Sequence, residues 1–189
     1  MASPATQTLL RAIYRVLPGK RPSRERRLSN AWLRRNVGDI EGRVLSIGSQ
    51  HDADREGGRY RDYFGRAKSY ATSEVTAETG ADLVLDVRRM PEVADESYDC
   101  IFCSGVLEHV DDYPAALSEM TRVLRRGGIL LLGVPFRQAI HNAPLDFWRF
   151  TEGAIRFLLK DRYEILMLDP IETSVPNFPA SYWVKARRR

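Results

Sequence analysis

Two short segments of the chain carry residue types that could bind or deprotonate a reacting group. One contains His109, and the other spans residues 141–151, HNAPLDFWRFT. Histidine changes its charge near neutral pH, so His109 and His141 are candidate general bases. Asp146 and Arg149 could contact an acceptor molecule, or they could pair with each other at the start of a helix because they lie three residues apart. His109 could also serve only to close its loop through hydrogen bonds, together with the acidic residue before it.

Runs of apolar residues predict the strands that would position these segments. Five such runs lie at residues 43–47, 68–73, 82–86, 98–103 and 129–134. They are apolar almost throughout, which is typical of strands buried on both faces of a parallel sheet. Two further runs, 163–168 and 182–185, are joined by a proline-rich loop and predict an antiparallel pair at the sheet edge. The sequence therefore predicts an α/β fold with a doubly wound, mostly parallel, seven-stranded sheet.

Helix signals lie between several of these strands. Asp111 or Asp112 can cap a helix that has Pro114 in its first turn, and Gly127-Gly128 is expected to end it. Another helix is predicted from Thr151 onward.

The region before the first strand has helical character. Apolar residues recur at helical spacing over residues 9–17, and Ser23 can cap a second helix. We interpret residues 1–38 as an N-terminal helical extension that covers the pocket as a lid, and residues 39–189 as the main domain.

Ligands of such sheets bind beyond the carboxyl ends of the strands, near the point where the strand order reverses. A dinucleotide would need the pattern G-x-G-x-x-G there, so that pyrophosphate can meet backbone N–H groups at a helix N-terminus. Gly48 is present, but Gln50 and Ala53 replace the other two glycines, and acidic residues follow. The pattern G-x-x-x-x-G-K-[ST] is absent from the sequence as well. These features argue against a nicotinamide oxidoreductase and against a phosphate-bearing cofactor.

S-adenosylmethionine suits the same strand ends better, because it carries a sulfonium cation and no phosphate. One close backbone approach at Gly48 suffices for it. Glu74, after the second strand, can accept hydrogen bonds from both ribose hydroxyls. Asp86, after the third strand, could accept one from the adenine amino group, beside the backbone of Val87.

Three stretches in particular resemble the class I methyltransferases, in the type 11-like family. They are VLSIGSQ at residues 44–50, VLEHV at 106–110 and RVLRRGG at 122–128. The resemblance implies a Rossmann-like methyltransferase fold in which residues 39–189 bind S-adenosylmethionine. It adds Ser49 and Ser104 to the cofactor contacts named above.

The resemblance also implies direct transfer of a methyl group to an oxygen, nitrogen or carbon nucleophile. The donor is already activated, so the enzyme would mainly align the reactants and exclude water. Segments similar to residues 141–151 occur in family members of bacterial surface-glycan biosynthesis, so we expect a small-molecule or glycan-type acceptor. Ser46 and Gln50 depart from the family pattern. They keep open the alternative of a catalytically degenerate module that binds the cofactor, its product or another protein.

Charge and composition limit the expected partners and location. The net charge is +4, but basic residues gather in the first 43 residues and at the C-terminal end, around an acidic body. A nucleic-acid enzyme usually has basic residues around its cleft, so no nucleic-acid substrate is expected. The basic ends are either solvated flanks or contacts to an anionic surface. Neither a membrane span nor a cleaved signal peptide is indicated, and a cytoplasmic location is expected.

Cys100 and Cys103 have the spacing of half a zinc site or of a redox pair. On a strand, however, residues three apart face opposite sides of the sheet. No second pair of cysteines or histidines has a suitable spacing. The sequence therefore predicts two reduced cysteines and no metal site.

Overall fold

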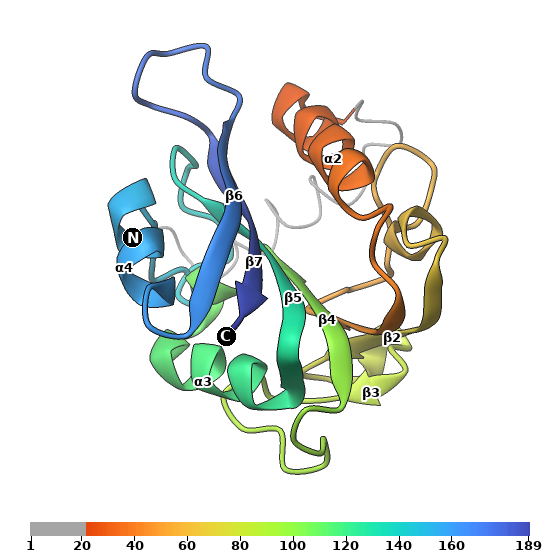
Figure 1. Cartoon of the computed structure of the whole chain (residues 1–189). Coiled ribbons are helices and arrows are strands. Elements are labelled where there is room, and N and C mark those ends of the chain that lie inside the picture. Colours follow the sequence, from red (N-terminus) through yellow and green to blue (C-terminus); the bar gives the residue numbers. More distant parts are fainter. Residues whose placement is uncertain (1–21) are drawn as a thin grey trace.

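The computed structural model describes residues 22–189, so the predicted helix over residues 9–17 lies outside the described residues. Its centre is a seven-stranded sheet in the order β3-β2-β1-β4-β5-β7-β6 (Figure 1). The strands are β1 Gly42–Ile47, β2 Ala67–Glu74, β3 Leu83–Val84, β4 Tyr98–Ser104, β5 Leu124–Pro135, β6 Tyr163–Ile171 and β7 Ser181–Arg188. Strands β1 to β5 pair in parallel, and β7 runs antiparallel to β5 and β6. The predicted sheet is confirmed, and its order reverses between β1 and β4.

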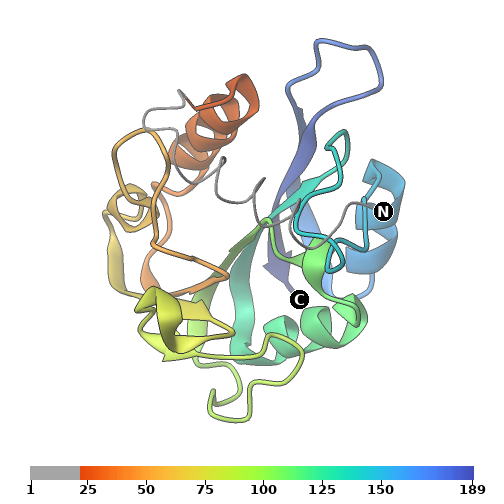
Figure 2. The same cartoon turned by 180° about the vertical axis from the view of Figure 1, so that it is seen from behind.

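One face of the sheet is covered by two predicted helices. They are α3 Tyr113–Val123 and α4 Glu152–Leu159. The Asp112 carboxylate accepts a hydrogen bond from the N–H of Ala115 at 3.1 Å, and the Thr151 hydroxyl accepts one from the N–H of Ala154 at 3.1 Å. Figures 1 and 2 show both helices on one side of the sheet, where their apolar residues share a core with the strands.

The opposite face is covered by helix α2, Arg24–Asn36 (Figure 1). The Ser23 hydroxyl caps it by accepting a hydrogen bond from the N–H of Arg26 at 3.1 Å, as predicted. Trp32 and Leu33 are buried against the sheet, and the Trp32 ring lies 5.3 Å from that of Trp183 in β7. Helix α2 is thus built into the second core of the protein.

The proposed boundary at residue 38 falls inside this second core. Val37 and Ile40, on either side of it, are 1% and 3% exposed and belong to the same cluster. The α2 part of the N-terminal extension is therefore continuous with the main domain in its packing.

Between β1 and β2, residues 48–66 form a loop whose only helix is the 3₁₀-helix η1, Tyr60–Tyr63. Two buried carboxylates organise this loop. Asp54 accepts hydrogen bonds from the Tyr63 hydroxyl at 2.6 Å and from the N–H of Gly58 at 2.9 Å. Asp52 accepts one from Nε of Arg61 at 2.8 Å. These two carboxylates therefore stabilise the loop through hydrogen bonds between its own residues. The sequence indicated only that acidic residues follow Gly48.

The end of α3 differs from the prediction. Gly127-Gly128 was expected to stop the helix, but α3 ends at Val123 and both glycines lie in β5. Leu124 is fully buried and extended, and it pairs with Tyr98 in β4. The helix therefore ends where the chain becomes extended and joins the sheet beside β4. The glycines instead serve the strand, because a Cβ on Gly128 would lie 3.0 Å from the carbonyl oxygen of Asp99.

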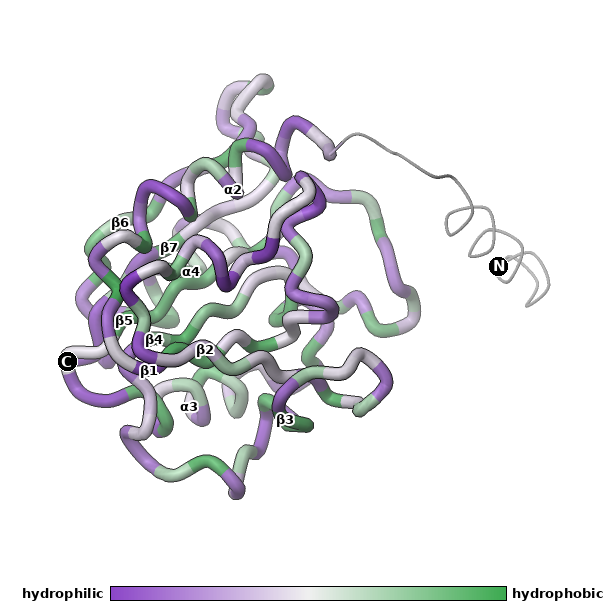
Figure 3. The backbone as a smooth tube through the Cα atoms, turned by 90° about the vertical axis from the view of Figure 1, so that its right-hand side faces the viewer, coloured by the Kyte–Doolittle hydropathy of each residue, from purple (hydrophilic) through white to green (hydrophobic). Residues whose placement is uncertain are grey.

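The hydropathy of the residues agrees with this layered arrangement. Figure 3 shows apolar positions in the central strands and hydrophilic ones along many of the loops.

Cys100 belongs to the core under α2 and Cys103 to the core under α3 and α4, so they face opposite sides as predicted. Both thiols are unpaired and buried, and burial raises their pKa. They are held as small apolar side chains.

The basic C-terminal residues lie in β7 and have partners. Lys185 Nζ is 2.7 Å from Asp39, Arg187 pairs with Glu164 at 3.1 Å, and Arg188 pairs with Glu96 at 3.2 Å. Lys185 is bound within the fold, whereas Arg187 and Glu164 form an exposed pair. A solvated flank and a contact to an anionic surface both remain predictions for this end. Within residues 22–189, no helix has the length and apolar character that crossing a membrane requires.

Candidate active site

A cavity of about 620 Å³ opens at the carboxyl ends of β1, β4 and β5. Helix α2, the turn after β1, the 3₁₀-helix η3 (Leu107–His109) and the loop over residues 136–149 contribute to its wall. The predicted site residues in the wall are Gly48, Ser49, Ser104, His109 and His141. The predicted site residues outside it are Glu74, Asp86, Val87, Asp146 and Arg149.

The turn after β1 is fixed by its backbone. Gly48 has a φ of 66°, and a Cβ at this position would lie 2.3 Å from a methyl carbon of Val106. The N–H groups of Gly48 and Ser49 both donate to the carbonyl oxygen of Ser73, at 3.0 and 3.1 Å. Only glycine fits this left-handed, closely packed position without strain.

Ser46 and Gln50, which depart from the family pattern, both fit the geometry of this turn. Ser46 is 1% exposed, and its hydroxyl lies 2.8 Å from that of Ser49. Gln50 takes a left-handed φ of 49°, so it follows a backbone path that glycine adopts most easily. Its N–H donates to a carboxylate oxygen of Glu74 at 2.5 Å. Glu74 therefore stands at the end of β2 and holds the tip of the turn.

Asp86 follows β3, the strand that pairs with β2. Its carboxylate already accepts hydrogen bonds from a neighbouring side chain. The Arg88 guanidinium donates to it at 2.7 Å and also binds Asp111 at 2.8 Å. The hydrogen bonds from Arg88 lower the pKa of Asp86, so this carboxylate is charged at neutral pH. Val87 is buried in the core with 8% exposure.

Three ionisable side chains meet at the other end of the cavity: Glu108, His109 and His141. The two imidazole rings meet edge to face, with centroids 4.8 Å apart. Glu108 is 2% exposed, and burial raises the pKa of its carboxyl group to about 7. Oε1 of Glu108 lies 3.9 Å from Nε2 of His109, while Oε2 is buried and has no hydrogen-bond partner among residues 22–189.

Asp146 and Arg149 form a clamp beside these residues. Arg149 donates to both carboxylate oxygens of Asp146, at 2.6 and 2.9 Å, and the Asp146 side chain is 1% exposed. The hydrogen bond from Arg149 holds the pKa of Asp146 well below its usual range. Asp146 also accepts the backbone N–H of His141 at 2.7 Å. Of the two roles left open by the sequence, the structure shows the pairing.

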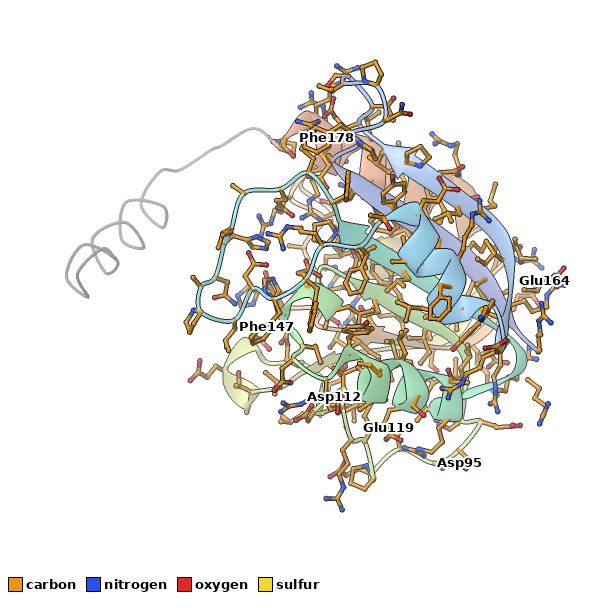
Figure 4. All side chains as sticks on the ribbon, turned by 90° about the vertical axis from the view of Figure 1, so that its left-hand side faces the viewer. Asp95, Asp112, Glu119, Phe147, Glu164 and Phe178 are labelled. Atoms are coloured by element: carbon orange, nitrogen blue, oxygen red, sulfur yellow. The ribbon has the colours of Figure 1, made fainter. Side chains whose placement is uncertain are left out.

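Hydrogen bonds fasten the 136–149 loop to the segment around η3. The carbonyl oxygen of Glu108 accepts the N–H of Phe147 at 2.7 Å, and that of Val110 accepts Nε1–H of Trp148 at 2.9 Å. Nδ1 of His109 lies 2.5 Å from the carbonyl oxygen of Leu145. Figure 4 shows Phe147 on this loop, near the start of α3 at Asp112. The two histidines are thus brought together by hydrogen bonds to main-chain carbonyl groups between distant segments.

Sequence reasoning assigned no pocket role of their own to several residues of the wall. Glu108 was read only as the neighbour of His109, and no signal marked its carboxylate as buried. Arg26 and Ser29 of α2 also line the cavity, and Arg26 donates to the Tyr60 hydroxyl at 2.8 Å. Their position one turn apart on a capped helix could have indicated a shared face, but only the structure shows what that face covers.

Comparison with known proteins points to one family. A family model described as "Methyltransferase domain" matches residues 62–132. A malonyl-[acyl-carrier protein] O-methyltransferase of Serratia marcescens is 31% identical over 139 residues, which cover 65% of this chain. The matched region spans 53% of the length of that relative.

Solved structures share the fold at low sequence identity. A methyltransferase of Haloferax volcanii, described as putative and solved with its Trm112 activator, matches with a TM-score of 0.67 at 16% identity over 87% of this chain and 90% of its own. The 1,6-didemethyltoxoflavin-N1-methyltransferase of Burkholderia thailandensis matches with a TM-score of 0.65 at 18% identity. That match covers 100% of this chain and 91% of the Burkholderia chain, which was solved with its substrate and S-adenosylhomocysteine.

Proposed function

Because the chain carries a class I, S-adenosylmethionine-dependent methyltransferase domain of the type 11-like family, we propose that it methylates a small-molecule or glycan-type acceptor. The methyl group would pass directly to an oxygen, nitrogen or carbon atom. One observation carries the proposal: a single cavity of about 620 Å³ joins the turn at Gly48 to the ionisable residues Glu108, His109 and His141. This volume lies within the usual range of small-ligand sites.

The strand ends suit a cofactor without phosphate. The turn after β1 leads into a loop, so it lacks the helix N-terminus that would favour a pyrophosphate. Glu74 stands close to this turn and could accept hydrogen bonds from the ribose hydroxyls once its contact with Gln50 is shared. When bound, S-adenosylmethionine supplies an activated methyl group on a sulfonium sulfur. Gly48, Ser49 and Ser104 line the space that it would enter.

The protein would mainly align the methyl donor with the acceptor and exclude water from the site. Helix α2 closes one side through Arg26 and Ser29, and we propose that this wall keeps water from the reacting atoms. His109 and His141 stand at the acceptor end and are placed to take the proton of an acceptor hydroxyl or amine. The clamp of Asp146 and Arg149 acts through His141, whose backbone it fixes.

The acceptor class is supported by the cavity and by the comparisons. The Burkholderia methyltransferase was solved with bound 1,6-didemethyltoxoflavin, and the Serratia relative is named as an O-methyltransferase of malonyl-[acyl-carrier protein]. The walls of the acceptor end are polar, with Gln138, His141 and Asn142 from the 136–149 loop. Such a lining suits an acceptor rich in hydrogen-bonding groups.

Turnover of the donor tests the proposal. The full chain would be incubated with S-adenosylmethionine and pools of phenols, sugar acids, amino sugars and carrier-bound thioesters, while S-adenosylhomocysteine is quantified. At least one pool should raise product formation above the acceptor-free background, and a His141→Ala variant should lower that rate. If every pool stays at background while S-adenosylhomocysteine still binds, the methyltransferase proposal fails.

Ser46 and Gln50 support the alternative of a degenerate binding module. Ser46 stands where the family carries an acidic residue, and Gln50 where it carries a glycine. Back-substitution separates the two proposals. A Gln50→Gly variant should change the turnover of an active enzyme by less than about threefold, because Gln50 already follows the left-handed path. A variant that gains turnover absent from the natural chain would support degeneracy.

A further inference from the structure

We infer that Glu108, His109 and His141 form a binding site for a divalent transition-metal cation at the acceptor end of the cavity. One carboxylate oxygen of Glu108 and one ring nitrogen of each histidine all lie within 4.8 Å of one another. Two imidazoles with one carboxylate are a ligand set typical of Zn²⁺ and of Fe²⁺, Mn²⁺ or Co²⁺. The inference departs from the sequence expectation of no metal site, and it does not depend on methyl transfer. With the cation bound, the ring nitrogens that hold it would not be free to take a proton.

The Glu108 carboxylate gives an independent reason to expect a ligand. Its side chain is 2% exposed, and Oε2 has no hydrogen-bond partner within the described structure. A buried acceptor of this kind costs free energy unless something satisfies it. Arg149 does not supply the missing donor, since its Nη1 and Nη2 already bind Asp146. A cation held by the Glu108 carboxylate between the two imidazoles would neutralise this buried group.

His109 is oriented as a metal ligand usually is. Nδ1 of His109 lies 2.5 Å from the carbonyl oxygen of Leu145, so this nitrogen carries the hydrogen and donates it. The lone pair is then on Nε2, which is the atom 3.9 Å from Glu108. Histidines that bind metals commonly donate their other ring N–H to a carbonyl or a carboxylate in this way.

His141 is supported by the clamp. Nδ1 of His141 lies 3.4 Å from the Asp146 carboxylate and 3.2 Å from the carbonyl oxygen of Ala139. Arg149 fixes Asp146 in turn, and this gives His141 an outer layer of partners like that of His109. Both imidazoles are therefore held by the fold, although they come from segments more than thirty residues apart.

A modest movement would complete the site. Ligand atoms about 2.1 Å from a cation lie roughly 3–3.5 Å from each other, so the three side chains would need to close by about 1–2 Å. His141 keeps 40% of its side chain exposed, and the freedom for this movement lies there. Three protein ligands leave coordination positions open toward the cavity, as catalytic metal sites do.

Metal titration of the chelator-treated full chain tests the inference, with ZnCl2 and CoCl2 as probes and MgCl2 as a negative control. Calorimetry should show one site per chain for Zn²⁺ and Co²⁺, and Co²⁺ should give visible absorption bands of a nitrogen-and-oxygen site. Mg²⁺ should bind far more weakly, because it prefers oxygen ligands. No cofactor is present in this experiment, so its result is separate from that of the turnover assay.

Substitutions locate the bound cation. His141→Ala and Glu108→Gln should each weaken Zn²⁺ binding by at least about tenfold. His51→Ala removes the remaining histidine of the chain, which also faces the cavity, and should leave the affinity unchanged. Circular dichroism confirms that each variant is folded, and Glu108→Gln keeps the shape of the buried side chain. Absence of Zn²⁺ and Co²⁺ binding overturns the inference, and so does binding that survives in His141→Ala and Glu108→Gln.

Discussion

The two ends of the cavity are built by different means. At the end formed by the turn after β1, main-chain hydrogen bonds to Ser73 and one carboxylate, Glu74, fix the backbone. At the end formed by η3 and the 136–149 loop, hydrogen bonds to main-chain carbonyl groups are joined by an ion pair of side chains, Asp146 with Arg149. We infer from this difference that the end at the turn after β1 would bind a ligand through its fixed backbone shape. The other end combines folding stability with reactive groups.

Breaking the clamp should have the largest effect on stability. Asp146→Ala leaves the Arg149 guanidinium without its buried partner and frees the backbone of His141. We expect a loss of about 2–4 kcal/mol in the free energy of unfolding, measured by urea denaturation. Asp62→Ala is the matched control, because it removes an exposed ion pair with Arg59 and should cost less than about 0.5 kcal/mol. Equal costs for the two variants would contradict the contrast between the ends.

A substitution in the turn after β1 should lower both the stability of the protein and its affinity for the ligand. A Gly48→Ala methyl would meet Val106 and strain a left-handed residue, which should cost about 1–3 kcal/mol of stability. The displaced turn should also weaken S-adenosylhomocysteine binding by at least about tenfold, or 1.4 kcal/mol, as measured by calorimetry. Gly65→Ala is the control, since nothing lies within 4 Å of a Cβ at that position. Wild-type affinity in Gly48→Ala would show that the cofactor does not approach this turn.

Removing the Glu74 charge should affect affinity with little cost to stability. Glu74→Gln keeps the shape of the side chain but removes its charge and replaces one of the two acceptor oxygens that the ribose hydroxyls would use with a donor. We expect affinity for S-adenosylhomocysteine to fall about tenfold, because hydrogen bonds to a charged group contribute about 1.5–3 kcal/mol. Glu78→Gln, on the exposed 3₁₀-helix η2 (Ala77–Thr79), should bind like the wild type. Normal binding by Glu74→Gln would refute the ribose assignment.

The smallest effect is expected at Ser49. Its hydroxyl points back to the carbonyl oxygen of Ser46 at 2.7 Å, so the side chain supports the turn from within. Ser49→Ala should cost about 1 kcal/mol of stability and change the affinity for S-adenosylhomocysteine by less than about threefold. A loss of tenfold or more in a calorimetric titration would mean that the hydroxyl contacts the cofactor directly.

The two ends also differed in how well the sequence predicted them. The sheet and the turn at Gly48 could be predicted from the chain, because the turn follows directly after an apolar strand. Glu74 and Asp86 also follow strands, but they lie outside the cavity wall. The other end depends on tertiary contacts: His109 and His141 meet only because Leu145 and Phe147 bind the segment around η3. The helix boundary predicted at Gly127-Gly128 was wrong because the chain joins the sheet earlier, where Leu124 pairs with Tyr98.

The central claim is that the turn after β1 and its neighbouring strand ends bind S-adenosylmethionine. Calorimetric titration of the full chain with S-adenosylhomocysteine, and separately with NADH, tests it most directly. We predict one binding site per chain for S-adenosylhomocysteine and none for NADH, because the turn has no helix N-terminus behind it for a pyrophosphate. Absence of S-adenosylhomocysteine binding by a folded chain, or binding of NADH in its place, would contradict the account.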